Sequence, residues 1–210
     1  MPTPRNWLIW LGHSLLALFL LVLFWQAVLF TQVIWWSRFD PDSTSFMRMR
    51  LAELRASDPK AELRHHWVPY ERISIHLKRA VVAAEDDRFL DHEGFDWEGI
   101  QRALEKNERR GRLSAGGSTI SQQLAKNLFL SPSRSWLRKG QEAVLTVMIE
   151  QTWDKRRILE VYLNVVEWGN GLFGAEAAAQ RYYRSSAAQL GPAQAARLAV
   201  MLPNPRRYER

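Results

Sequence analysis

The sequence predicts a mainly α-helical protein with one domain behind a single membrane-spanning helix. An uncharged apolar stretch runs from Trp7 to Trp36. The segment from Asp154 to Trp168 repeats its apolar residues with the helical period, and no stretch alternates apolar and polar residues as a half-buried strand does. At 210 residues the chain has room for one domain and an anchor, but not for two sizeable cores.

Residues 1–37 are expected to form the transmembrane anchor. Arg5 is the one Lys, Arg, Asp or Glu in this segment, and the apolar run exceeds the roughly 20 residues that span a bilayer as a helix. Two tryptophans lie near each end, as in interfacial aromatic belts. The alternative is a cleaved signal peptide, but the run is too long for one and no small-residue cleavage site follows it.

The part of the chain after Trp36 is basic. It holds all 22 acidic residues and all but one of the 29 lysines and arginines. A basic balance suits nucleic acid, anionic lipid headgroups or a phosphate-bearing substrate, and the last two fit better behind a membrane anchor. The absence of cysteine excludes disulfides, thiolate metal sites and a cysteine nucleophile.

Residues 38–69 are expected to be a connector with one helix, and residues 70–210 the main folded domain. Turn signals at 40–43 and 65–69 bound the connector. Helical segments are expected over Ser45 to Ala56, Ile75 to Glu85, Ser118 to Leu128, Trp136 to Glu150, Asp154 to Trp168, Ala175 to Tyr183 and Pro192 to Met201.

A first polar cluster runs from Glu85 to Asp96. Glu85 ends a helix of Val and Ala residues whose composition indicates burial. Partial burial raises the pKa of a carboxyl group towards neutrality, which suits a general acid or base. A solvated helix end with a charged turn explains the same residues equally well.

A second cluster runs from Gly116 to Asn127. Ser118 is expected to cap the helix that follows, whose N-terminus attracts anions. Thr119, Gln122 or Gln123, and Lys126 fall on one face of this helix, and their hydroxyl, amide and ammonium groups suit sugars and phosphates. The candidate substrate-binding residues of this cluster are Ser118, Thr119, Gln122, Gln123, Lys126 and Asn127.

The third cluster contains Glu142 in a helix that is nearly all apolar from Ala143 to Ile149. Glu142 is therefore expected to be buried, with Arg138 four residues before it on the same face as its partner. A buried ion pair with a purely structural role is the strong alternative. The fourth segment, Lys155 to Gly169, reads by itself as an ordinary amphipathic core helix.

The order and spacing of these clusters resemble the peptidoglycan glycosyltransferases of the penicillin-binding-protein type, in their monofunctional biosynthetic form. The resemblance covers about Trp67 to Tyr208. It is carried by ED-x-x-F-x-x-H-x-G-x-D at Glu85 to Asp96, G-S-T-x-x-Q-Q-L-x-K-N at Gly117 to Asn127, R-K-x-x-E at Arg138 to Glu142, K-x-x-I-L-E-x-Y-L-N at Lys155 to Asn164, the stretch from Gly174 to Tyr183 and L-P-x-P at Leu202 to Pro205.

The resemblance implies a lysozyme-like helical domain with a small membrane-facing lobe. It implies polymerisation of lipid II into β-1,4-linked glycan with inversion at the donor anomeric carbon and release of undecaprenyl pyrophosphate. By this resemblance Glu85 and Glu142 are catalytic, with Glu85 as general base. Lys126 and Arg134 match the pyrophosphate-binding positions, and Arg138 and Lys139 are expected to assist them.

The resemblance also implies the surroundings of the enzyme. Its partners are expected to be lipid II, the growing lipid-linked chain, the membrane and other cell-wall synthesis or division proteins, with no nucleic acid. No cofactor is expected to be required, although a divalent cation (Mg or Mn) fits near Asp86, Asp87 and a pyrophosphate. No metal site is assigned. The domain is expected outside the cytoplasmic membrane with the N-terminus inside. Transpeptidase activity is expected to be absent, and a short C-terminal tail to be missing.

Three rival functions remain open from the residues. A lytic transglycosylase or lysozyme-like hydrolase shares a catalytic glutamate, but it has no pyrophosphate to hold with Lys126. A non-catalytic scaffold of the cell-wall machinery has no need for Glu85. A nucleic-acid binder is the weakest alternative, because the basic residues are dispersed among acidic ones.

Overall fold

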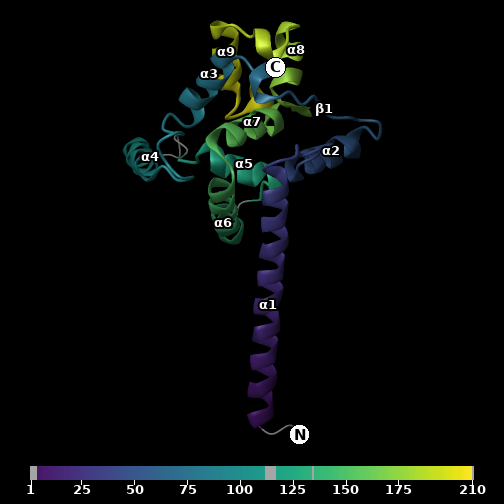
Figure 1. Cartoon of the computed structure of the whole chain (residues 1–210), viewed down its shortest axis with the longest axis vertical. Helices are drawn as coiled ribbons and strands as arrows, with labels where there is room; N and C mark the ends of the chain where they lie inside the picture. Colours follow the sequence, from purple (N-terminus) through teal and green to yellow (C-terminus); the bar gives the residue numbers. More distant parts are fainter. Residues whose placement is uncertain (1–3, 112–116, 134, 210) are drawn as a thin grey trace. The chain divides into compact units, whose positions relative to one another are not determined.

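The computed structural model describes residues 4–111, 117–133 and 135–209. The chain divides into two compact units, Met1–Phe39 and Asp40–Arg210. The first consists mainly of helix α1 (Pro4–Trp36), which Figure 1 draws as one continuous helix. Its span from Ile9 to Trp36 is apolar enough to cross a membrane. At ~1.5 Å of rise per residue, its 33 residues exceed the ~30 Å hydrocarbon core.

The second unit is mainly helical, as expected. Its helices are α2 (Ser45–Ser57), η1 (Tyr70–Arg72), α3 (Ile75–Glu85), α4 (Trp97–Arg110), α5 (Ile120–Phe129), α6 (Trp136–Thr152), α7 (Lys155–Val165), α8 (Ala175–Tyr183), η2 (Ala187–Gln189), α9 (Pro192–Met201) and α10 (Pro205–Tyr208). The expected connector contributes α2 and a short strand to this unit.

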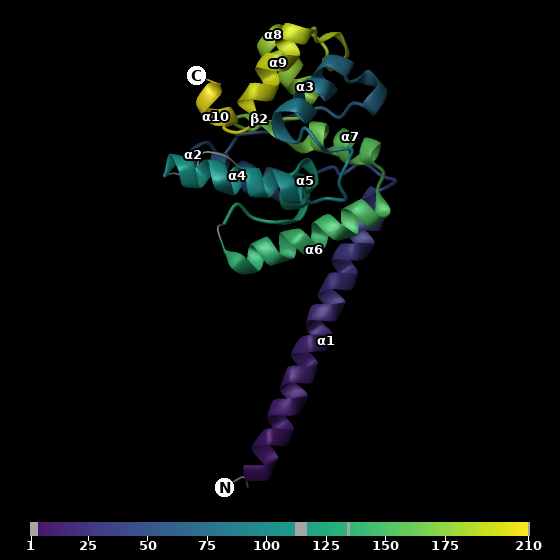
Figure 2. The same cartoon turned by 90° about the vertical axis from the view of Figure 1, so that its left-hand side faces the viewer.

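Helix α5 lies at the centre of this unit, where it packs against α2, α6 and α7. Its side chains Ile120, Leu124 and Leu128 recur at helical spacing and are fully buried. Both views show α6 on one side of α5, and α7, α8 and α9 on the other (Figures 1 and 2). Helix α3 packs on α9, so Glu85 at the end of α3 reaches α5 from the side of α9.

A small three-stranded sheet is the main feature that the sequence pattern did not indicate. Its order is β1 (Arg64–His65), β3 (Leu172–Phe173) and β2 (Glu167–Gly169). The first pair is parallel and the second antiparallel. Strands of two or three residues are too short to show an alternating pattern. The helix that was expected to run to Trp168 ends at Val165 in the structure, because the chain continues from there into β2.

Candidate active site

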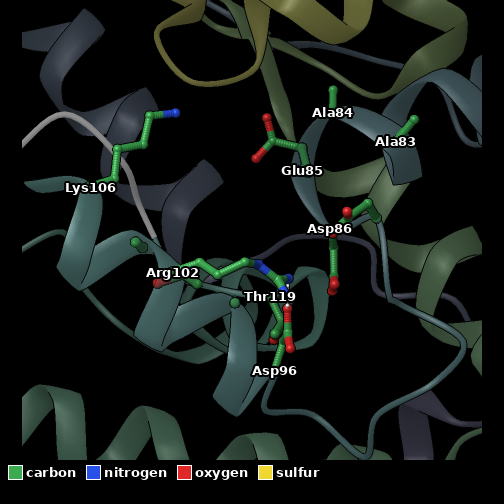
Figure 3. Close-up of a pocket in the computed structure, with 13 residues that line it drawn as sticks. Ala83, Ala84, Glu85, Asp86, Asp96, Arg102, Lys106 and Thr119 are labelled. Atoms are coloured by element: carbon green, nitrogen blue, oxygen red, sulfur yellow. Dashed lines mark hydrogen bonds and ion pairs between the residues drawn. The ribbon is translucent and has the colours of Figure 1, made fainter.

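Glu85 is placed at a cavity by the end of α3. The cavity has a volume of about 460 Å³ and opens between the end of α3, α4 and the start of α5 (Figure 3). We call it the Glu85 cavity. It is lined by Ala83, Ala84, Glu85, Asp86, Asp87, Asp96, Gly99, Arg102, Ala103, Lys106, Gly117, Ser118 and Thr119. Of the residues expected to bind substrate, Ser118 and Thr119 thus line the same cavity as Glu85.

The two carboxylate oxygens of Glu85 have different surroundings. Oε2 accepts a hydrogen bond from Nε2 of Gln123 at 2.8 Å. Oε1 is buried and has no hydrogen-bond partner among the described residues. Most buried polar atoms in proteins are paired, so an unpaired carboxylate oxygen at a cavity is available to a ligand.

Burial raises the pKa of Glu85 above its ordinary value. The hydrogen bond from Gln123 and the positive charge of Lys126 act in the opposite direction, and the negative charge of Asp86 adds to the increase. A carboxylate whose pKa is raised binds a proton more tightly than an ordinary one, which suits a general base.

Asp86 fixes the position of Glu85 relative to α5. Its Oδ2 accepts a hydrogen bond from the backbone N–H of Ile120 at 2.9 Å, and its Oδ1 lies 2.9 Å from Nε2 of His92. His92 Nδ1 accepts from the backbone N–H of Gly94 at 3.1 Å, so Nε2 carries the proton and donates to Asp86. Gly94 has a φ of 92°, where side chains are strained.

The N-terminus of α5 is closed by a capping box. The hydroxyl of Thr119 accepts from the backbone N–H of Gln122 at 3.2 Å, and the side chain of Gln122 accepts from the backbone N–H of Thr119 at 3.0 Å. Thr119 is therefore the N-cap, and the expected cap at Ser118 is wrong by one residue. Ser118 is exposed at the cavity, whereas Gln122 is buried and its side chain is engaged in the cap.

A second group of charges surrounds Glu142 on α6. Nη1 of Arg138 lies 2.6 Å from Glu142 Oε2, and Nζ of Lys139 bonds to Glu142 Oε1. The expected pairing of Arg138 with a buried Glu142 is confirmed, since the glutamate is 3% exposed. We call Glu142, Lys126, Arg138 and Lys139 the Glu142 cluster.

Lys126 links the Glu142 cluster to Glu85. Burial lowers the pKa of Lys126, and the positive charges of Arg138 and Lys139 lower it further. The negative charges of Glu142 and Glu85 raise it. Lys126 thus lies within electrostatic range of both glutamates, although it is not among the described residues that line the Glu85 cavity.

The remaining expected residues are placed less directly. Asn127 is buried on α5. Arg134, expected at the pyrophosphate, lies outside the described residues. Arg102 and Lys106 on α4 line the Glu85 cavity and were not singled out in the sequence, because their arrangement depends on a helix that no motif marks. Figure 3 shows Lys106 and Glu85 pointing into the cavity from opposite sides.

The expected divalent cation finds no ready ligands among the described residues. Those residues contain no group of three or more His, Asp or Glu side chains that could hold a metal ion. Both oxygens of Asp86 already bind protein groups, at His92 and at Ile120. Each oxygen of Asp86 thus has one protein donor on it.

Comparison with known proteins gives one consistent result. The chain is 77% identical over 201 residues to a biosynthetic peptidoglycan transglycosylase of Azoarcus sp. (strain BH72), covering 96% of this chain and 87% of that protein. It is 72% identical over 199 residues to the same enzyme of Aromatoleum aromaticum, covering 95% and 86%. The transglycosylase family model matches residues 51–210. The chain therefore belongs to the transglycosylase family.

Proposed function

We propose that this protein is a monofunctional peptidoglycan glycosyltransferase that polymerises lipid II, with Glu85 as its general base. The names of its relatives support the reaction class. The observation that carries the residue assignment is the carboxylate of Glu85, which has one oxygen fixed by Gln123 and one buried oxygen with no partner in the described part of the chain, at a cavity.

The proposed reaction is a displacement at the anomeric carbon of the growing chain. Glu85 Oε1 takes the proton from the 4-hydroxyl of the incoming lipid II. The hydroxyl oxygen attacks C1 of the donor sugar, and the bond from C1 to the pyrophosphate oxygen breaks. Attack and departure occur on opposite faces, so the anomeric centre inverts, as in inverting glycosidases. Undecaprenyl pyrophosphate leaves with the bonding electron pair.

The Glu142 cluster is proposed to stabilise the departing pyrophosphate. The leaving group gains negative charge in the transition state, and fixed cations stabilise that state more than the ground state. Lys126, Arg138 and Lys139 supply the cations, and Arg134 joins them in this proposal. Glu142 is held between Arg138 and Lys139, which supports a role in orienting cations rather than in moving a proton.

The transmembrane helix gives the reaction its location. A substrate with a long isoprenoid tail stays in the bilayer, so the enzyme works at the membrane surface. We propose that the N-terminus lies in the cytoplasm and that residues 38–210 lie on the outer side of the cytoplasmic membrane. A reporter enzyme that works only outside the cytoplasm is then active when it is fused after Arg210, and one that works only in the cytoplasm is inactive. The reverse result contradicts this topology.

The function is tested by incubating the purified full chain with labelled lipid II and separating polymer from substrate. The wild type is expected to form polymer, and Glu85→Gln to lose about 10³-fold or more of this activity, because the variant has no base. Near-normal polymerisation by Glu85→Gln would falsify the base assignment. A parallel incubation with purified glycan distinguishes a hydrolase, which shortens the polymer and does not consume lipid II.

A further inference from the structure

The hydroxyl group of Tyr162 on α7 ends a chain of hydrogen bonds that begins at Glu85. The tyrosine O–H donates to Oε1 of Gln123 at 2.9 Å, and Nε2 of Gln123 donates to Oε2 of Glu85 at 2.8 Å. The tyrosine is 0% exposed, so its hydroxyl cannot exchange this partner for bulk water. The amide of Gln123 thus bridges a core residue and the proposed base.

We propose that Tyr162 is a positioning residue of polymerisation: its hydroxyl holds the side-chain amide of Gln123 in the orientation that donates to Glu85. The inference rests on the proposed function, in which Glu85 is the base. Helical spacing predicts that the helix carrying Tyr162 belongs to the core, and the tyrosine ring is buried there. The hydroxyl adds a role that helical spacing cannot reveal.

The orientation of a side-chain amide is decided by its partners, because its two ends are nearly equal in shape but opposite in hydrogen bonding. In the observed orientation, the Tyr162 proton has an acceptor and the Glu85 carboxylate has a donor. Rotating the amide by half a turn leaves the buried Tyr162 proton without an acceptor and directs a carbonyl oxygen at Glu85. An ionised carboxylate is repelled by that oxygen, so only a protonated Glu85 tolerates the rotated amide.

The amide orientation therefore bears on the protonation state of the base. The hydrogen bond from Gln123 lowers the pKa of Glu85 against the increase that burial causes. Among the described residues, the other charged groups that line the cavity or influence Glu85 are the carboxylates of Asp86, Asp87 and Asp96 and the cations of Lys126, Arg102 and Lys106. The hydroxyl of Tyr162 is neutral, because burial raises its pKa well above the ordinary value. Replacing the Tyr162 hydroxyl removes none of these charges, so the change isolates the effect of the amide.

The simpler explanation is that Tyr162 is a core residue whose hydroxyl merely needs an acceptor. That explanation predicts a loss of stability without a change in the pH dependence of catalysis. A positioning role predicts a change in pH dependence that acts through Gln123 and disappears when Gln123 is absent. A double-mutant cycle measures this dependence.

The experiment compares the full-length wild type with Tyr162→Phe, Gln123→Ala and the double variant. Each protein is assayed for kcat/KM with labelled lipid II from about pH 5 to pH 9, and its unfolding midpoint is recorded. Tyr162→Phe keeps the ring, so the core volume is retained. Tyr182→Phe is the matched control, because the Tyr182 hydroxyl donates to the backbone carbonyl of Trp168 at 2.9 Å and does not contact Gln123.

Gln123→Ala is expected to move the acid limb of kcat/KM to higher pH by about one unit, because Glu85 loses a donor to its charged form. Tyr162→Phe is expected to move the acid limb in the same direction by a smaller amount. Tyr182→Phe is expected to leave the limb where it is in the wild type. The double variant is expected to shift the limb no further than Gln123→Ala does. Additive shifts in the double variant, or a wild-type limb in Tyr162→Phe, overturn the inference. Failure of the wild type to form polymer overturns the proposed function itself.

Discussion

The carboxylate of Asp86 accepts a hydrogen bond from the backbone N–H of Ile120 at 2.9 Å, and so joins the end of α3 to the start of α5. The proposed base Glu85 and its neighbours Gln123 and Lys126 lie on these two helices. One side chain thus aligns the proposed base with the groups that control its charge.

Asp86→Ala is expected to lower both stability and activity. The variant loses a helix-terminal hydrogen bond and leaves His92 without its carboxylate, which costs about 1–3 kcal/mol. Because Gln123 and Lys126 then shift relative to Glu85, polymerisation is expected to fall by about tenfold or more. Chemical unfolding in detergent and the lipid II assay measure the two effects.

The control for stability is Asp87→Ala, the adjacent carboxylate, which is exposed. Its stability is expected to stay within about 0.5 kcal/mol of the wild type. Equal losses of stability in the two variants would show that the contacts of Asp86 with α5 and His92 contribute nothing to the free energy of unfolding.

Glu85→Gln is expected to be more stable than the wild type at neutral to alkaline pH. Burial raises the folded-state pKa of Glu85 above the unfolded value of about 4.3. The folded protein therefore binds the proton more tightly, and wild-type stability falls as pH rises through the interval between the two pKa values. The amide that replaces the carboxylate carries no charge and can still accept from Gln123, so the variant avoids this loss.

The difference between the two unfolding midpoints is expected to be greatest above the raised pKa, at about pH 8, and to vanish near pH 4. Each unit of pKa elevation corresponds to about 1.4 kcal/mol. Glu108→Gln, at an exposed position on α4, serves as the control and should show no such dependence. A Glu85→Gln protein that is less stable than the wild type at every pH contradicts the account of the Glu85 pKa.

Glu142→Gln is expected to reduce kcat/KM by about a hundredfold, because the cations around position 142 lose the charge that orients them. It should also move the alkaline limb of the pH profile to lower pH. Burial lowers the pKa of Lys126 and the Glu142 charge raises it, so the variant loses the Lys126 cation at a lower pH. The measurement is kcat/KM with lipid II across the pH range.

Glu176→Gln is the matched control for this prediction. Glu176 is also a buried glutamate, but on α8, where it accepts from the backbone N–H of Ala187 at 2.7 Å. Its amide variant is expected to keep the pH profile of the wild type. If Glu142→Gln shows only a loss of stability with an unchanged alkaline limb, the glutamate is a structural partner of Arg138 and no more.

The main helices were predictable because their ends carry local signals. Pro192 at the first position of α9 and the polar ends of α3 define bounds that the structure reproduces at Ile75–Glu85 and Pro192–Met201. The pairing of Arg138 with Glu142 followed from spacing within one helix. Information of this kind lies within a few residues of the feature it predicts.

Features that depend on distant contacts were not predictable from one sequence. The strand β1 pairs with β3 more than a hundred residues later, between segments too short to carry a pattern. The hydroxyl of Tyr162 on α7 donates a hydrogen bond to Gln123 on α5, whereas helical spacing predicts only that the tyrosine ring is buried. Helix α4 is highly polar, so it has few of the apolar positions that mark a buried helix. The sequence pattern therefore does not identify Arg102 and Lys106 as residues of the cavity.

The final prediction concerns the buried ion pair that attaches α2 to the sheet. Nε of Arg50 lies 2.7 Å from Oε1 of Glu167, and Nη2 lies 3.0 Å from Oε2, with both side chains less than a tenth exposed. Among the described residues, Glu167→Ala leaves the guanidinium buried with one ion-pair partner, the half-exposed Glu53. Breaking one side of such a pair costs about 3–5 kcal/mol, so the unfolding midpoint should fall steeply.

Replacing both members with apolar residues, as in Arg50→Met with Glu167→Leu, is expected to restore most of this stability, because no uncompensated charge is then buried. Glu53→Gln is the control, since Arg50 keeps its buried partner in that variant. All three proteins are compared by urea unfolding in the same detergent. A double variant as unstable as Glu167→Ala would mean that the sheet needs the Glu167 carboxylate itself, which also accepts from the backbone N–H of Gly171 at 3.3 Å.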